Sequence, residues 1–314
     1  MDTYLSLAQL TQPFGPAAVT IGKFDGVHTG HLAVIDQLTG IAADRDLTSV
    51  AVTFDRNPLG LFAPERCPTA LVSNAQRLEL LGATGLDATV MFEFDRAFAA
   101  KTPEEFVGEV LVEGLGAKAV LVGPDFKFGA KGAGTVAALV DFGARFGFDV
   151  VTIDEFDVDG RRVSSTWIRE LLAGGDVEGA TRLLGRLPSL RAEVVHGEHR
   201  GRELGYPTAN LAREVEGFIP LDGVYAAWLV VDGEQYGAAV SIGNNPTFDG
   251  VPAHQIEAHA FDQSFDLYAR VVELRLAHYV RGMRKFSGAD ELAAQMRDDE
   301  RRIRELLELQ APAE

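Results

Sequence analysis

The feature that most constrains the fold is a change in the pattern of apolar segments near residue 184. Before it, short apolar runs alternate with helix-like segments such as 31–45 and 102–116. The predicted strands lie at 17–21, 49–54, 88–94, 119–123 and 148–153. Because wholly apolar strands that alternate with helices are typical of a parallel sheet covered on both faces, we predict a Rossmann-like α/β domain at 1–184.

Beyond that point the chain has the pattern of an all-β domain followed by one helix. Residues 224–243 have the pattern of a hairpin whose turn is Asp232-Gly233. Further strand and helix patterns follow at 255–261, 267–280 and 287–309. Ser287 is the predicted N-cap of the final helix. We therefore predict a small antiparallel β-barrel, closed by a C-terminal helix, at 185–314.

Composition excludes several classes of partner. The formal net charge of -17 argues against bulk attraction to nucleic acid or to an anionic membrane. The single cysteine, Cys67, cannot form an intrachain disulfide and has no nucleophile motif around it, so we interpret it as a surface or packing residue. The N-terminus lacks the pattern of a signal peptide, and no apolar stretch approaches the ~20 residues of a membrane span. We expect a cytoplasmic protein; the sequence does not indicate protein partners.

The segment GKFDGVHTGH at 22–31 follows the first predicted strand. Its glycines let the backbone approach a ligand closely. His28 and His31 lie about one turn apart where a helix is expected to begin, a position that favours anions. Two imidazoles there can donate to phosphate oxygens and stabilise the charge that develops in nucleotidyl transfer. A zinc pair is the alternative, but no third ligand is suitably spaced nearby.

Three other segments follow later predicted strands: TFDRNP at 53–58, VGPDFKFG at 122–129 and SSTWIR at 164–169. Since ligands of parallel sheets bind beyond the carboxyl ends of the strands, we expect all four segments at one edge. In the last of them, hydroxyl groups and free N–H groups at a helix start can cradle phosphate, and Arg169 adds a cation with two donors.

These four segments, in this order, resemble the adenylyltransferase module of the prokaryotic bifunctional riboflavin kinase/FMN adenylyltransferase family, also called FAD synthetases. The second half is similar to the family's kinase module in GRELGYPTANL, DGVYAAW, SIGNNPTF and QIEAH, at 201–211, 222–228, 241–248 and 255–259. The resemblance implies that the barrel phosphorylates riboflavin to FMN with ATP and Mg²⁺. It implies that the α/β domain adenylylates FMN to FAD with a second ATP, releasing pyrophosphate.

The resemblance also implies roles for single residues. In the adenylyltransferase, His28 and His31 would be catalytic, and the ATP contacts would be Gly22, Phe24, Gly26, Gly30, Ser164, Ser165, Thr166 and Arg169. The flavin contacts would be Asn57, Asp125, Phe126 and Phe128, although the two phenylalanines are in isolation typical of core side chains. In the kinase, ATP and magnesium would meet Gly201, Thr208 and Asn210, of which Thr208 and Asn210 would hold the metal. Glu257 would be the base that deprotonates the flavin hydroxyl.

Some positions need a separate interpretation. Gly129 and Gly134 have P-loop spacing, but Thr135 stands where the lysine belongs, so this is not a Walker A sequence. Asn57 stands where the family commonly has histidine, and still offers a donor and an acceptor. Ala269 stands where glycine is common, which makes a tight turn harder to form.

Three alternative functions remain at this point. One of the two modules could be inactive. The chain could be another HxGH nucleotidyltransferase, although that would not explain PTAN and QIEAH. It could also be a non-catalytic flavin-binding or RNA-regulating protein, against which the net charge of -17 and the polar site residues argue.

Overall fold

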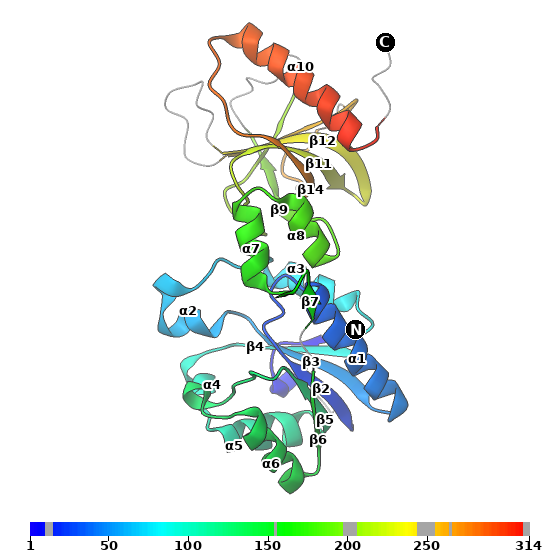
Figure 1. Ribbon diagram of the computed structural model, residues 1–314, viewed down its shortest axis with the longest axis vertical. Coiled ribbons are helices and arrows are strands. Elements are labelled where there is room, and N and C mark those ends of the chain that lie inside the picture. The colour runs from blue at the N-terminus through cyan, green and yellow to red at the C-terminus, as the bar shows by residue number, and fades with distance from the viewer. Residues whose placement is uncertain (10–14, 154–155, 197–205, 244–254, 264–265, 310–314) are drawn as a thin grey trace. The chain divides into compact units, whose positions relative to one another are not determined.

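The computed structural model describes residues 1–9, 15–153, 156–196, 206–243, 255–263 and 266–309. The chain forms two compact units, Met1–Ser164 and Ser165–Glu314. Figure 1 shows an α/β arrangement in the first unit and a barrel with helices in the second. Two helices, α7 (Ser165–Ala173) and α8 (Val177–Leu184), belong to the second unit although they precede the expected domain boundary at residue 184.

A six-stranded parallel sheet forms the centre of the first unit, in the order β1-β4-β3-β2-β5-β6. The strands are β1 (Asp2–Tyr4), β2 (Ala17–Ile21), β3 (Thr48–Phe54), β4 (Ala88–Phe92), β5 (Ala117–Val122) and β6 (Asp149–Thr152). The predicted parallel sheet is confirmed, with one strand more than expected. The added strand β1 has only three residues, too few to show a sequence pattern, and pairs with β4 at the edge.

Helices cover both faces of this sheet. On one face, α1 (Thr29–Asp44) and α3 (Asn74–Gly82) pack against the strands through Ile35, Leu38 and Leu81. On the other face lie η3 (Phe106–Gly114), a π-helical segment that continues α5 (Pro103–Glu105), and α6 (Val136–Phe146). The shorter helices are η1 (Leu7–Gln9), α2 (Pro58–Phe62), η2 (Pro64–Arg66), α4 (Arg96–Ala100) and η4 (Ala130–Gly132). Burial on both faces explains why the central strands are apolar throughout.

The strand order places a topological switch point beside β2. From β2 the chain proceeds to β3 and β4 on one side, and then crosses to β5 on the other side of β2. Ligands of such sheets bind at the carboxyl ends of the strands, where the order reverses. The loops after β2 and β5 therefore flank the expected binding crevice.

The SSTWIR segment comes after the last strand of the sheet, as expected, but does not follow it directly. A two-stranded hairpin, β7 (Asp157–Val158) with β8 (Arg161–Arg162), lies between β6 and this segment. The sequence analysis did not anticipate this hairpin. Two-residue strands carry too little sequence pattern to be recognised in advance.

The second unit contains a closed six-stranded antiparallel barrel, in the order β10-β13-β12-β11-β14-β9, with β9 pairing back to β10. The strands are β9 (Ser189–Val195), β10 (Ala209–Leu211), β11 (Gly223–Val231), β12 (Glu234–Gly243), β13 (Gln255–Ala260) and β14 (Val271–Arg281). The predicted hairpin is confirmed: Asp232 and Gly233 join β11 to β12 with φ angles of 52° and 85°. Positive φ at both residues is what a type I′ hairpin turn requires.

The final helix α10 (Ala289–Leu306) packs on the outer face of the barrel, where Ile303 meets Val224 and Ala226. Its predicted N-cap was wrong. Gly288 occupies the cap position, and Ser287 instead donates its backbone N–H and its hydroxyl to Glu291, at 2.9 and 2.7 Å. In the part of the chain that the structure describes, no helix is long and apolar enough to cross a membrane.

Candidate active sites

The two predicted catalytic histidines cap the start of α1 reciprocally. The Nδ1 atom of His28, the N-cap residue, accepts the backbone N–H of His31 at 3.3 Å. The Nδ1 atom of His31 accepts the backbone N–H of His28 at 3.4 Å. This is a capping box in which imidazole rings replace the usual hydroxyl and carboxamide groups. The spacing of the two histidines therefore has a local structural cause.

The reciprocal cap determines the tautomer of each neutral ring. In a neutral imidazole one nitrogen donates and the other accepts. Because both Nδ1 atoms accept backbone N–H groups, the proton of each neutral ring is on Nε2. The two rings stack with their centroids 3.6 Å apart, and His28 is only 6% exposed. Two stacked imidazole rings thus lie at a helix N-terminus, a position that favours phosphate oxygens.

The loop before these histidines has an unusual backbone. Phe24 and Val27 have positive φ angles of 47° and 39°, and Gly26 has 83°. A positive φ at a β-branched residue such as Val27 is strained, and such strain clusters at functional sites. A Cβ added to Gly30 would lie 3.2 Å from the His28 Nδ1, and one added to Gly22 would lie 3.1 Å from the Phe24 ring. These glycines therefore permit the close packing around the histidines.

The loop after β3 places Asn57 at the N-cap of α2, where its Oδ1 accepts the Leu59 N–H at 3.1 Å. The Asn57 amide nitrogen is not used in that bond. Asp55, which the sequence analysis did not single out, accepts the Phe94 N–H at 2.8 Å. Burial opposes ionisation of Asp55, but hydrogen bonds from Arg56 and Phe94 hold its pKa below the usual value. Its position directly after an apolar strand was the signal that could have identified it.

Of the predicted flavin contacts in 125–128, the two aromatic residues differ in burial. Phe128 is buried and packs with Phe106 in the core, whereas Phe126 is partly buried and stacks on Phe128 with ring centroids 5.6 Å apart. Phe128 therefore has the packing role that its isolated pattern suggested, and Phe126 is the better placed to meet a ligand. Asp125 is exposed and pairs with Arg162 at 3.2 Å, and that pairing lowers the pKa of Asp125.

The Ser164–Arg169 segment forms the predicted helix start, since α7 begins at Ser165. Ile168 and Leu172 are its buried residues, whereas Thr166 is exposed and Arg169 half-buried. The first turn of α7 leaves backbone N–H groups without helical partners, as every helix start does. Ser164 ends the first compact unit, and the rest of the segment belongs to the second.

The glycine pair with P-loop spacing makes a turn, as the missing lysine had indicated. Phe128 and Gly134 form an isolated antiparallel bridge, and Thr135 caps α6 by accepting the Ala138 N–H at 3.2 Å. A Cβ on Gly129 would lie 2.6 Å from the Pro103 backbone nitrogen. The glycines therefore serve close backbone packing here.

In the barrel, two predicted site residues and one further polar residue form a row across neighbouring strands. Glu257 on β13 lies directly opposite Asn210 on β10 and opposite Ser241 on β12. The residues flanking Glu257, Ile256 and Ala258, belong to the buried barrel interior. Since successive side chains of a strand point to opposite faces, Asn210, Ser241 and Glu257 lie on the outer face. α10 packs against this same face of the barrel.

Thr208 and Asn210 are neighbours in space. The Asn210 side-chain nitrogen lies 3.5 Å from the Thr208 hydroxyl and 3.4 Å from its carbonyl oxygen. The row thus offers hydroxyl, amide and carboxylate oxygens, the hard donors that Mg²⁺ prefers, and Mg²⁺ completes its shell with water and substrate phosphates. The side chains present fit a magnesium–nucleotide site. Gly201 lies outside the described residues.

The zinc alternative finds no support in the described segments: no three His, Cys, Asp or Glu side chains among them gather as a metal site. Cys67 is a half-buried free thiol whose sulfur would lie 3.3 Å from a Cβ on Gly60. It packs against α2, in keeping with the interpretation that it is a surface or packing residue.

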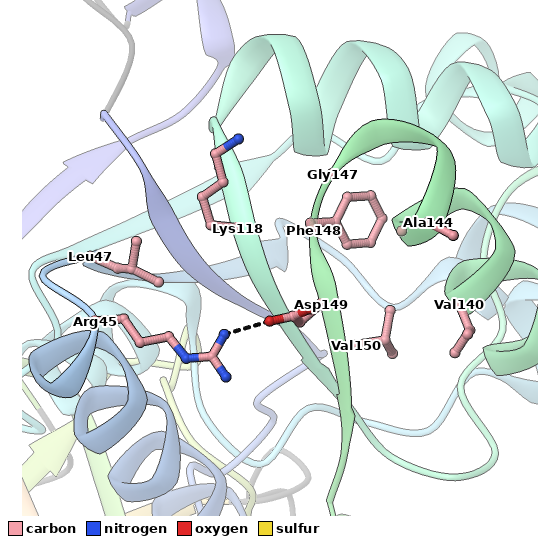
Figure 2. Close-up of a pocket in the computed structure, with 10 residues that line it drawn as sticks. Arg45, Leu47, Lys118, Val140, Ala144, Gly147, Phe148, Asp149 and Val150 are labelled. Carbon is pink, nitrogen blue, oxygen red and sulfur yellow. Dashed lines mark hydrogen bonds and ion pairs between the residues drawn. The ribbon is translucent and has the colours of Figure 1, made fainter.

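Figure 2 shows a cavity of about 710 Å³ in the first unit. It opens at the amino-terminal edge of the sheet, between the starts of β5 and β6 and the ends of α1 and α6, and includes none of the predicted site residues. Leu47 and Phe148 contribute apolar surface to it. Two cations line it, Arg45 and Lys118, but Arg45 is paired with Asp149 at 2.6 Å, and apolar side chains make up much of the remaining lining.

Comparison with known proteins covers both halves of the chain. A family model described as FAD synthetase matches residues 11–167, and one described as riboflavin kinase matches residues 184–307. The bifunctional riboflavin kinase/FMN adenylyltransferase of Escherichia coli K12 is 38% identical over 298 residues, which is 94% of each chain. The protein of the same description from Bacillus subtilis is 31% identical over 287 residues, 90% of each chain. A crystal structure described as a macrolide-efflux protein from Streptococcus pneumoniae superposes with a TM-score of 0.86 at 30% identity, covering 96% of this chain and 98% of that chain.

Proposed function

The chain belongs to the bifunctional riboflavin kinase/FMN adenylyltransferase family, and from this premise we propose which of its residues carry each reaction. It makes FAD from riboflavin by way of FMN, with ATP as the second substrate, so the family expected from the motifs is confirmed. The alternative of another HxGH nucleotidyltransferase is wrong, because the kinase family matches the second half. The assignment of single residues is the proposal.

The observation that carries the adenylyltransferase assignment is the reciprocal cap of His28 and His31. In FMN adenylylation the FMN phosphate attacks the α-phosphorus of ATP, and pyrophosphate leaves. The two Nε2–H groups donate to phosphate oxygens and stabilise the negative charge that grows in the transition state. No covalent enzyme intermediate is needed, so positioning and charge stabilisation supply the rate enhancement.

The remaining adenylyltransferase residues bind and orient the substrates in this proposal. Gly22, Phe24, Gly26 and Gly30 bring the β2 loop backbone close to ATP, and the helix start at Ser164, Ser165 and Thr166 contacts its phosphates together with Arg169. Asn57 donates its amide N–H group to the flavin, since its oxygen already caps α2. Phe126 offers a ring face for flavin stacking, with Asp125 and Phe128 beside it in sequence.

In the kinase we propose that Glu257 takes the proton of the riboflavin 5′-hydroxyl as that oxygen attacks the γ-phosphorus of ATP. Thr208 and Asn210 would hold Mg²⁺ with the ATP phosphates. A bound magnesium ion supplies neutralisation of the charge on those phosphates. The pairing of Asn210 with Glu257 across β10 and β13 supports this assignment, because the proposed base and a proposed metal ligand are then neighbours.

Two broader expectations are part of the proposal. We place the adenylyltransferase domain at 1–184 and the kinase domain at 185–314, a division supported by the family matches, which end at 167 and begin at 184. The expected cytoplasmic location stays a prediction.

The test is a pair of half-reactions measured on the full chain. One assay follows riboflavin to FMN, and the other follows added FMN to FAD, each with ATP and Mg²⁺. His31→Ala and Arg169→Ala should lower only FAD formation, by ~10²–10³-fold for loss of a charge-stabilising donor. Arg169→Lys should recover only part of the activity, since an ammonium group keeps the charge but cannot reproduce the two donors of the planar guanidinium. Unchanged FAD formation in both alanine variants would remove these residues from the mechanism.

A further inference from the structure

A buried arginine of α3 bonds to the backbone of both loops that carry the predicted adenylyltransferase residues. Arg77 is 7% exposed. Its Nη1 donates to the Lys23 carbonyl at 2.7 Å, and its Nη2 donates to the Phe54 carbonyl at 2.6 Å. The Nη2 also contacts the Asn74 side-chain oxygen at 2.5 Å, within the same helix. One guanidinium therefore joins three points of the chain.

The two carbonyls belong to different site loops. Lys23 lies in the segment that leads from β2 to His28, and Phe54 is the last residue of β3, just before the segment that carries Asn57. The Lys23 carbonyl accepts a second bond from the Thr53 hydroxyl at 3.2 Å. Hydrogen bonds from both β3 and α3 therefore hold the loop after β2 in place.

Burying this cation has a free-energy cost that an apolar side chain would avoid. Burial lowers the pKa of Arg77, and the nearby carboxylates of Asp25 and Asp55 only partly offset that effect. Its Nε is buried without a hydrogen-bond partner in the described structure. Buried ionic groups are a poor source of stability compared with well-packed apolar residues. The arrangement therefore points to a role other than stabilising the core.

We propose that Arg77 is a positioning residue for FMN adenylylation. It fixes the separation of the loops after β2 and β3, so that His28 and His31 on one loop and Asn57 on the other meet the same pair of substrates. The inference rests on the proposed roles of those three residues. A guanidinium group is needed because its two terminal nitrogens can donate to two carbonyls in a fixed geometry. The single ammonium group of lysine cannot do this.

The experiment compares Arg77→Met and Arg77→Lys with wild type in the full chain. Met keeps a long unbranched stem without donors, and Lys keeps the charge. Turnover and KM are measured for both half-reactions at a temperature well below unfolding, with the folded fraction taken from near-ultraviolet circular dichroism. The matched control is Arg45→Met, which removes an exposed arginine paired with Asp149 at the far edge of the sheet.

We expect Arg77→Met to lower kcat for FMN adenylylation by ~10²-fold, the scale on which a displacement of about 1 Å costs rate. KM for ATP should stay within about threefold, riboflavin phosphorylation should not change, and Arg77→Lys should lie between wild type and Arg77→Met. Arg45→Met should match wild type in both assays. Wild-type kcat for adenylylation in Arg77→Met, or equal losses in both half-reactions once the folded fraction is included, would overturn the proposal.

Two further variants keep the result interpretable. If Arg77→Met does not fold, Thr53→Val is the decisive variant: removing its bond to Lys23 should lower only adenylylation kcat, by about tenfold, and wild-type kcat there would overturn the inference. His31→Ala separates this inference from the function it rests on. Loss of adenylylation in His31→Ala but not in the Arg77 variants refutes the positioning role alone, whereas no loss in His31→Ala refutes the site assignment itself.

Discussion

Asn210 on β10 and Glu257 on β13 are direct cross-strand partners on the outer face of the barrel. Side chains directly opposite each other on antiparallel strands have Cβ atoms about 4.5–5.5 Å apart. A carboxylate and an amide from segments far apart in sequence are thereby held next to each other without any flexible loop between them. This relationship makes the kinase assignment testable at single positions.

Glu257→Gln should fold normally and still make FAD from added FMN, but lose riboflavin phosphorylation by ~10²-fold or more. Glutamine keeps the size and hydrogen bonding of glutamate but cannot accept the hydroxyl proton. The measurement is riboflavin-to-FMN turnover, with FMN-to-FAD turnover as the internal control. Wild-type kinase rates in this variant would show that Glu257 is an ordinary strand residue, whose substitution typically changes stability by no more than about 0.5 kcal/mol.

Thr208→Ala should weaken the same half-reaction for a different reason, the loss of one proposed oxygen ligand of magnesium. Raising the Mg²⁺ concentration should therefore restore part of its activity, and should restore none in Glu257→Gln. A magnesium titration of both variants measures the difference. Identical magnesium profiles for Thr208→Ala and wild type would exclude Thr208 as a ligand.

The capping role and the proposed catalytic role of the His28 ring can be separated by substitution. His28→Asn keeps an oxygen that can cap α1 in place of Nδ1. Its free energy of unfolding should therefore lie within about 0.5 kcal/mol of the wild-type value, since asparagine is a preferred N-cap. It lacks the donor at the Nε2 position, so FAD formation should fall by ~10²-fold. His28→Gln offers a donor further out and should retain more activity but less stability. Chemical denaturation measures the effect on stability, and the FMN-to-FAD assay measures the effect on activity. Equal activity in the two variants would contradict the role of Nε2.

Ala269 occupies a backbone conformation that suits glycine, with φ at 57°. This agrees with the expectation, from the family resemblance, that glycine suits this position. A left-handed backbone conformation costs a non-glycine residue about 1–2 kcal/mol. Glycine avoids this strain, but its larger conformational entropy in the unfolded state offsets part of the stabilisation. We expect Ala269→Gly to raise the free energy of unfolding by about 0.5–1 kcal/mol without changing turnover. As control, Ala294→Gly on the exposed side of α10 should destabilise by about 1 kcal/mol; a loss of stability in Ala269→Gly would contradict the assignment of strain.

The proposed domain boundary predicts the behaviour of fragments. Residues 1–184 should convert FMN to FAD, whereas 1–164 should not, because it lacks Ser165, Thr166 and Arg169. On the other side, 165–314 should be more stable than 185–314. Val177 of α8 is fully buried in the barrel core, and its loss alone removes about 1.5–3 kcal/mol of apolar burial. Thermal unfolding and both assays test this, and equal stability of the two C-terminal fragments would show that α8 contributes nothing to the barrel.

Features that depend on local interactions were determined by the sequence. The apolar runs 17–21 and 49–54 are strands because every side chain in them is available for burial on one face or the other of a covered sheet. Asp232-Gly233 makes its hairpin because both residues tolerate positive φ. The HxGH spacing likewise puts the two histidines within one turn of α1, where the cap forms.

Features that depend on distant parts of the chain were decided by the tertiary structure. β1 exists because β4 offers it an edge, and three residues alone do not specify a strand. The register that sets Asn210 opposite Glu257 is fixed by which strand faces are buried in the barrel, not by either segment itself. Arg77 has no distinguishing sequence pattern, since an arginine on a helix is ordinarily exposed. Only the packing of α3 against the ends of β2 and β3 gives its donors two backbone carbonyls to bind.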